Sequence, residues 1–86
     1  MTTLLAYHDV DDVDHWLSSP RREQLFGPIG VTARTFVDAD KSKRTGVILE
    51  VPDMARFEEV MASEAALEAM KFDGVRPETL VILTEA

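Results

Sequence analysis

The sequence contains no cysteine, so neither a disulfide nor a thiolate metal site is available to it. Its 86 residues suffice for one domain, spanning 1–86, and are too few for two. A domain of this size buries only about 60–65% of the surface that its unfolded chain exposes. Small domains without disulfides or metals are commonly stabilised by oligomerisation. We therefore expect a single domain that associates with a second copy.

Basic residues are also few, with nine Lys and Arg against sixteen Asp and Glu and a net charge of −7. Binding to phosphate groups requires a basic face, so neither nucleic acid nor an anionic membrane is an expected partner. No apolar stretch approaches the roughly 20 residues needed to span a bilayer. Residues 1–8 lack the basic and apolar regions of a secretory signal. A cytoplasmic protein is the resulting expectation.

The hydrophobic pattern predicts four strands, at residues 2–9, 29–38, 44–51 and 78–84. Two helical regions lie between them. The first begins near Asp11 or Asp12 and restarts after Ser19, because aspartate and serine are good helix caps. The second begins at Asp53 and restarts at Ser63 for the same reason. The order β-α-β-β-α-β predicts an α+β, ferredoxin-like fold, with a four-stranded antiparallel sheet and the helices on one face.

Three of the predicted strands are apolar on both faces. Their central segments are Leu4-Leu5-Ala6, Val47-Ile48-Leu49 and Leu80-Val81-Ile82-Leu83. If one face of an antiparallel sheet is exposed to solvent, its strands should instead alternate between apolar and polar residues. Two helices cover only one face of such a sheet. We expect a second copy of the chain to cover the other face, forming a homodimer.

The element order, the two-faced strands and the broken second helix together resemble the dimeric α/β-barrel superfamily. Its members include antibiotic-biosynthesis-monooxygenase-like proteins, small polyketide cyclases and muconolactone isomerase-like enzymes. The segment from Ser63 to Met70 is similar to a short helix late in such chains. The resemblance covers nearly the whole chain. It implies two ferredoxin-like sheets packed into a barrel, with a cavity inside the barrel or between sheet and helices.

The resemblance also implies binding of a small apolar, aromatic or polyketide-like molecule, and chemistry that needs neither a metal nor an organic cofactor. That chemistry would be of cyclase, isomerase or monooxygenase type. The monooxygenase-like members tend to place Asn, Trp, Tyr or His around the cavity. This chain contains no Asn. A catalytic pattern that requires Asn therefore does not carry over.

His8, near the end of the first strand, is the first candidate catalytic residue. A histidine at the opening of the cavity can act as a general base, because its pKa lies near neutrality. The alternative is a strand-end histidine bonded to a loop carbonyl or to solvent. His8 and Tyr7 should face opposite sides of the strand, so they are not expected to share the cavity without a bulge.

Trp16 shares a helical stripe with Val13 and Leu17, which predicts a core position. It can also stack on a flat ligand, which makes it a candidate substrate-binding residue. The methionines of the second helical region are expected to pack the core or, alternatively, to line a pocket. The run Arg21-Arg22-Glu23 is interpreted as a solvated helix face.

Arg34 and Glu50 form an unusual pair of charges in mid-strand. With a loop centred near Ser42, a hairpin would place Arg34 opposite Glu50, on the face that carries Phe36 and Ile48. We expect Arg34 to stabilise developing negative charge as a catalytic residue, and Phe36, Ile48 and Glu50 to contact substrate. The alternative is a cross-strand ion pair at a solvated sheet edge.

The sequence therefore predicts a dimeric barrel that binds, and can transform, a small apolar molecule with His8 and Arg34 as its catalytic groups. The second hypothesis is a non-catalytic dimerisation or ligand-binding module, in which the Arg34–Glu50 pair sets the register. Whether the protein is an enzyme depends on the interior. A pocket with converging polar groups indicates a ligand site, and a filled interior indicates the module.

Overall fold

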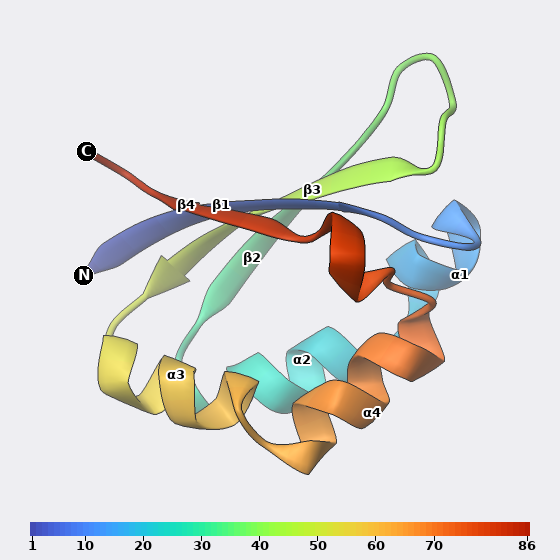
Figure 1. Cartoon of the computed structure of the whole chain (residues 1–86). Coiled ribbons are helices and arrows are strands. Elements are labelled where there is room, and N and C mark those ends of the chain that lie inside the picture. The colour runs from blue at the N-terminus through green and yellow to red at the C-terminus, as the bar shows by residue number, and fades with distance from the viewer.

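A computed structural model describes all 86 residues, and its elements follow the predicted order (Figure 1). One antiparallel sheet, in the order β2-β3-β1-β4, contains β1 (Thr2–Asp9), β2 (Thr32–Val37), β3 (Arg44–Val51) and β4 (Val81–Thr84). The helices are α1 (Val13–Ser18), α2 (Arg21–Phe26), α3 (Met54–Met61) and α4 (Glu64–Asp73). All four helices lie on the same side of the sheet (Figure 1). The α+β, ferredoxin-like fold is thus confirmed.

Three helices begin at the side-chain caps that the sequence indicates. Asp12, Asp53 and Ser63 each accept a hydrogen bond from the backbone N–H three residues further on, over 3.1–3.3 Å. Each bond satisfies one of the N–H groups that a helix start leaves without an intrahelical partner. The polar residues at these positions therefore fix where the helices begin.

Two strands begin later than the sequence predicts. β2 begins at Thr32 because the residues before it form a 3-10 turn, Gly27–Ile29, that ends at Gly30 with a left-handed φ of 73°. β4 begins at Val81 because Pro77–Thr79 also forms a 3-10 turn. Both turns contain proline near their first position, where its fixed φ and missing N–H are tolerated.

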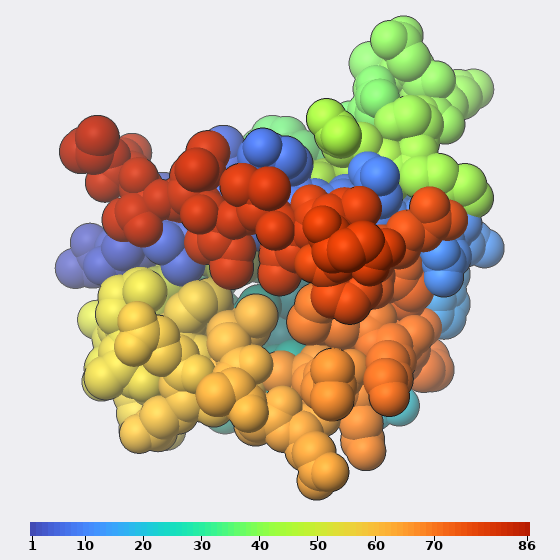
Figure 2. Space-filling model, viewed as in Figure 1, coloured from blue at the N-terminus to red at the C-terminus, as the bar shows by residue number.

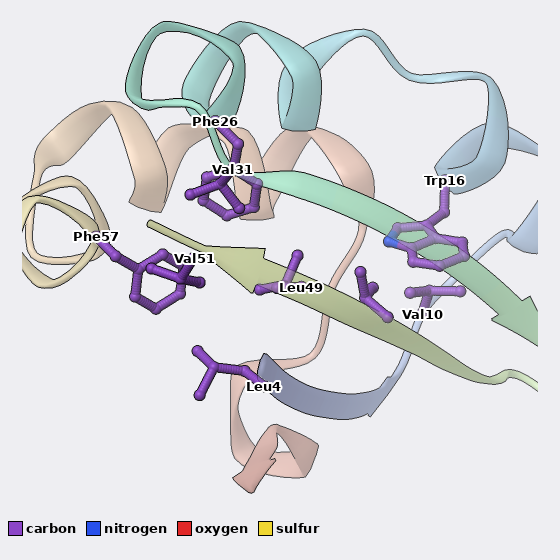
Figure 3. Packing of buried hydrophobic residues seen from close by; sticks show 9 residues of the cluster. Leu4, Val10, Trp16, Phe26, Val31, Leu49, Val51 and Phe57 are labelled. Carbon is purple, nitrogen blue, oxygen red and sulfur yellow. The ribbon is translucent and has the colours of Figure 1, made fainter. Parts of the chain in front are cut away.

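The core lies between the sheet and the helices. Leu4, Val10, Trp16 and Val51 are the largest side chains that are fully buried. Figure 3 shows Trp16 beside Val10 at one end of the core and Phe57 beside Val51 at the other. The core is therefore one continuous layer that runs along the helix-facing side of the sheet.

The opposite face of the sheet is open in the single chain. Phe36, Leu5 and Leu83 lie on it with 48%, 42% and 50% of their surface exposed. The prediction that these strands carry apolar residues on both faces is confirmed, since Leu4 and Leu49 are buried against the helices. None of the helices is long and apolar enough to cross a membrane.

Candidate functional site

A cavity of about 100 Å³ lies between the sheet and the helices. Figure 2 shows the molecule hollowed between β4 and the helices α3 and α4. Thirteen of the sixteen lining residues are hydrophobic. Three alanines, Ala6, Ala66 and Ala69, make room for it, and Met61 and Met70 form part of its wall. An apolar cavity of about 150 Å³ accommodates benzene; this one is smaller but open on one side, so an aromatic ligand would lie partly inside it and partly at its mouth.

His8 lines the cavity because the alternation of β1 turns it towards the helices, together with Leu4 and Ala6. Only 7% of its surface is exposed. The Thr45 hydroxyl lies 2.9 Å from Nδ1 and donates to the His8 carbonyl oxygen over 3.2 Å. A hydroxyl has one hydrogen, so both contacts form together only when Nδ1 carries the imidazole proton. That tautomer leaves the lone pair of Nε2 available to a ligand.

Burial lowers the pKa of His8, because a charged imidazolium is poorly solvated in this position. The positive charge of Arg22 lowers it further, and the backbone of His8 and the Asp9 carboxylate oppose the shift. The net direction is downward, so the imidazole is neutral at pH 7. A neutral imidazole with a free nitrogen can accept a proton.

Two further polar residues, Arg22 and Asp73, line the cavity from α2 and α4. Arg22 Nη2 and Asp73 Oδ1 are both buried and have no hydrogen-bond partner in the protein. Burial lowers the pKa of Arg22, and the Asp73 carboxylate acts against that shift. Arginine stays protonated at any physiological pH. The cavity therefore has apolar walls and one group each of positive and negative charge.

Trp16 contacts two of the three polar residues that line the cavity, His8 and Arg22. Its ring meets that of His8 edge to face, with centroids 5.6 Å apart and planes at 83°. The Arg22 guanidinium carbon lies 4.6 Å from the Trp16 ring centroid, in the arrangement of a cation–π contact. Trp16 thus belongs to the core, as predicted, and also lines the cavity, while its contact with a ligand stays a prediction.

The other four predicted site residues lie on the open face of the sheet, away from His8. Phe36, Arg34, Ile48 and Glu50 alternate with residues that face the helices. His8 and Arg34 are therefore on opposite faces, and one copy of the chain does not bring them together. Arg22 is the arginine that shares a cavity with His8.

The predicted pairing of Arg34 with Glu50 is wrong. Arg34 lies opposite Ile48, and Thr32 lies opposite Glu50. The hairpin centres on Lys41, which adopts a left-handed φ of 61°, instead of near Ser42. This difference of one position in the loop shifts the register by two residues. Glu50 instead accepts a hydrogen bond of 2.7 Å from the Thr3 hydroxyl on β1.

Sequence reasoning missed Arg22 and Asp73, although the spacing contained a signal for both. Arg22 precedes Leu25 and Phe26 by three and four residues, which places it on their side of the helix. Asp73 lies seven residues after Ala66 and four after Ala69, which places it on the same side of the helix as these two alanines. The interpretation of Arg21-Arg22-Glu23 as a solvated face is wrong for Arg22, whose Nη2 is buried.

No group of three or more His, Asp or Glu side chains is arranged to hold a metal ion. Among the cavity residues only His8 and Asp73 are ordinary metal ligands, and the other polar group there is a cation.

No known family profile and no curated protein matches the sequence. Solved structures do share the fold over the whole chain. One antibiotic biosynthesis monooxygenase matches with a TM-score of 0.66 and 15% identity, covering 100% of this chain and 97% of the other. A protein from Nitrosomonas europaea, provisionally described as an antibiotic biosynthesis monooxygenase, matches with a TM-score of 0.69 and 13% identity. The match covers 100% of this chain and 97% of the other.

A dimeric ferredoxin-like protein from Jannaschia sp. CCS1 gives a TM-score of 0.64 at 9% identity, covering 99% of this chain and 97% of the other. At such identities the likeness is one of fold. The resemblance to antibiotic-biosynthesis-monooxygenase-like proteins that the sequence indicates is confirmed in that sense.

Proposed function

We propose that this protein binds a small, largely apolar molecule in the cavity between sheet and helices, and that His8 accepts a proton from it. The observation that carries the proposal is the orientation of His8. Thr45 engages Nδ1 and leaves Nε2 free, and Arg22, whose Nη2 has no partner, lines the same largely apolar cavity as His8. A base and a cation in one cavity are the two groups that an anion-forming step needs.

The proton would move from an acidic O–H or C–H bond of the ligand to Nε2 of His8. The electron pair left on the ligand would be stabilised by the Arg22 guanidinium, whose charge acts strongly where water is excluded. Cyclisation and isomerisation of enolisable molecules begin with such an anion. Two of the structural neighbours are described as antibiotic biosynthesis monooxygenases, which adds a monooxygenase-type reaction as a related candidate.

A second copy of the chain is the proposed cover of the open face. Phe36, Leu5 and Leu83 are exposed there, and one structural neighbour is itself described as dimeric. Burying this face would remove large apolar side chains from water, each contributing about 1.5–3 kcal/mol when fully buried. Arg34 has no ion-pair partner within its own chain. A role for Arg34, Ile48 or Glu50 in contact with substrate remains a proposal that requires this second copy.

The open face also favours a second candidate, a ligand-binding or dimerisation module without catalysis. In that case the cavity would bind its ligand with no proton transfer. Replacing His8 with Gln distinguishes the two, since a binding module keeps most of its affinity and an enzyme loses its turnover.

The cavity can be tested as the ligand site with phenol as the probe. Trp16 is the only tryptophan, so its indole N–H resonance reports on the cavity without ambiguity. We expect phenol to shift this resonance in the wild-type protein. Ala69→Leu, which places three more carbons in the cavity, should weaken binding at least tenfold, since the space is only about 100 Å³.

Ala65→Leu is the matched control, because Ala65 lies on the same helix but is exposed. It should leave phenol binding unchanged. Equal binding by the Ala69→Leu and wild-type proteins, with both folded by circular dichroism, would show that phenol binds elsewhere and would remove the basis of the proposal.

A further inference from the structure

Arg22 Nη2 and Asp73 Oδ1 differ in hydrogen-bonding character, since a guanidinium only donates and a carboxylate only accepts. Both atoms are buried, both residues line the same cavity, and neither atom has a partner. Asp73 as a whole is only 6% exposed. Native proteins satisfy almost all buried polar groups, because an unsatisfied one costs its full desolvation. Two such exceptions in one cavity indicate a missing partner for each.

The two groups do not satisfy each other. The structure contains two ion pairs within 4.0 Å, Arg44–Asp9 and Arg76–Asp11, and Arg22–Asp73 is not among them. The Asp73 charge nevertheless acts on Arg22, as the pKa of Arg22 shows. The groups are therefore near enough to interact through space and too far apart to bond directly.

Building on the proposed function, we propose that the polar end of the ligand is neutral and carries an acceptor and a donor side by side. The acceptor would bind Arg22 Nη2 and the donor would bind Asp73 Oδ1. A carboxamide or a hydroxy ketone has this arrangement. A single ligand group of this kind completes both hydrogen bonds at once.

The same pair of charges disfavours ions. A carboxylate has no donor for Asp73 and would lie beside a second negative charge. An amidinium or ammonium group has no acceptor for Arg22 and would lie beside a second positive charge. Arg22 and Asp73 together have no net charge, so a neutral ligand meets no unbalanced charge. The apolar part of the ligand then faces the hydrophobic wall of the cavity.

Four aromatic probes of nearly equal size test this inference: benzamide, benzoate, benzamidinium and toluene. Benzamide offers an acceptor and a donor, benzoate only acceptors, benzamidinium only donors, and toluene neither. Titrations followed by the Trp16 indole N–H resonance give the four dissociation constants. We expect benzamide to bind tightest, by about tenfold or more, because each bond to a charged group contributes about that much.

Asp73→Asn is the matched variant, since it keeps the shape and replaces one acceptor oxygen with a donor. In this variant the affinity for benzoate should rise relative to the affinity for benzamide by about tenfold or more. A purely structural role for Asp73 would not produce this change. Should the variant fail to fold, the wild-type ranking of the four probes decides alone.

Tightest binding of benzoate, or equal binding of all four probes, would overturn the inference and leave the cavity as a ligand site. Absence of binding by all four, toluene included, would overturn the proposed function together with the inference. The two failures are thus distinguishable in one set of titrations.

Discussion

His8 links the proposed chemistry to the stability of the protein. Its pKa in the folded state lies below the ordinary value near 6.5, mainly because of burial. As the pH falls below about 6.5, the unfolded chain binds a proton at this residue and the folded chain does not yet do so. The free energy of unfolding must therefore decrease, by up to about 1.4 kcal/mol per pH unit, until the folded state also takes up the proton.

We expect His8→Gln to abolish this part of the pH dependence. Urea denaturation at a series of pH values between 7.5 and about 5 measures it. The control is His15→Gln, which changes the only other histidine, an exposed one. That variant should retain the decrease in stability that is assigned to His8. The same slope in His8→Gln as in wild type would mean that His8 is not the group that resists protonation.

At the scale of single residues, the sequence indicates His8 and Trp16 and misses Arg22 and Asp73. A histidine and a tryptophan are rare enough to attract a chemical hypothesis on their own. Arg22 lies in a run of charges and Asp73 lies beside the glycine that ends a helix, so a solvated face and a helix end explain them equally well. Only the packing of α2 and α4 shows that both reach the cavity.

The end of α4 positions Asp73, and Gly74 determines that end. Gly74 adopts a left-handed φ of 72°, and a Cβ at this residue would lie 3.2 Å from the Asp11 Cβ. Its carbonyl also accepts a hydrogen bond of 2.9 Å from the Asp11 N–H. The left-handed conformation costs an L-residue with a Cβ about 1–2 kcal/mol. We expect Gly74→Ala to lower the free energy of unfolding by about that amount, as measured by urea denaturation.

Gly27→Ala is the control at the element scale. Gly27 has ordinary right-handed angles, and an added Cβ meets only the flexible end of the Glu23 side chain. Gly27→Ala should therefore leave the free energy of unfolding almost unchanged. An equally large decrease in the free energy of unfolding for Gly27→Ala and Gly74→Ala would contradict this explanation. It would show that the conformation of Gly74 is not the cause of the destabilisation.

Elements were predictable where a local signal decides them. Asp12, Asp53 and Ser63 are caps whose chemistry acts within three residues, so the helix starts followed from the sequence. The start of β2 did not follow from the sequence. The turn Gly27–Ile29 contains proline and an apolar residue, and an apolar residue at this point is also typical of the start of a strand. The register of the β2–β3 hairpin depended on which loop residue, Lys41 or Ser42, takes the centre. Hydrophobic alternation is unaffected by a shift of two residues, so it could not distinguish them.

On the scale of the whole molecule, the two faces of the sheet have different roles in this account. The helix side encloses the cavity, and the open side is where a second copy would pack. The fold could be predicted because the element order is simple and the strands are apolar on both faces. The location of the cavity could not, because it depends on how far α3 and α4 stand from β4 (Figure 2).

The proposed pairing of two chains through the open face is tested by sedimentation. We expect the wild-type protein at micromolar concentration to sediment with twice the 9.6 kDa mass of one chain. Phe36→Arg, on the open face, should sediment as a single chain because a buried unpaired charge is costly. Leu67→Arg, an equally exposed position on α4, should remain paired. A wild-type protein that sediments as a single chain at this concentration would contradict the account.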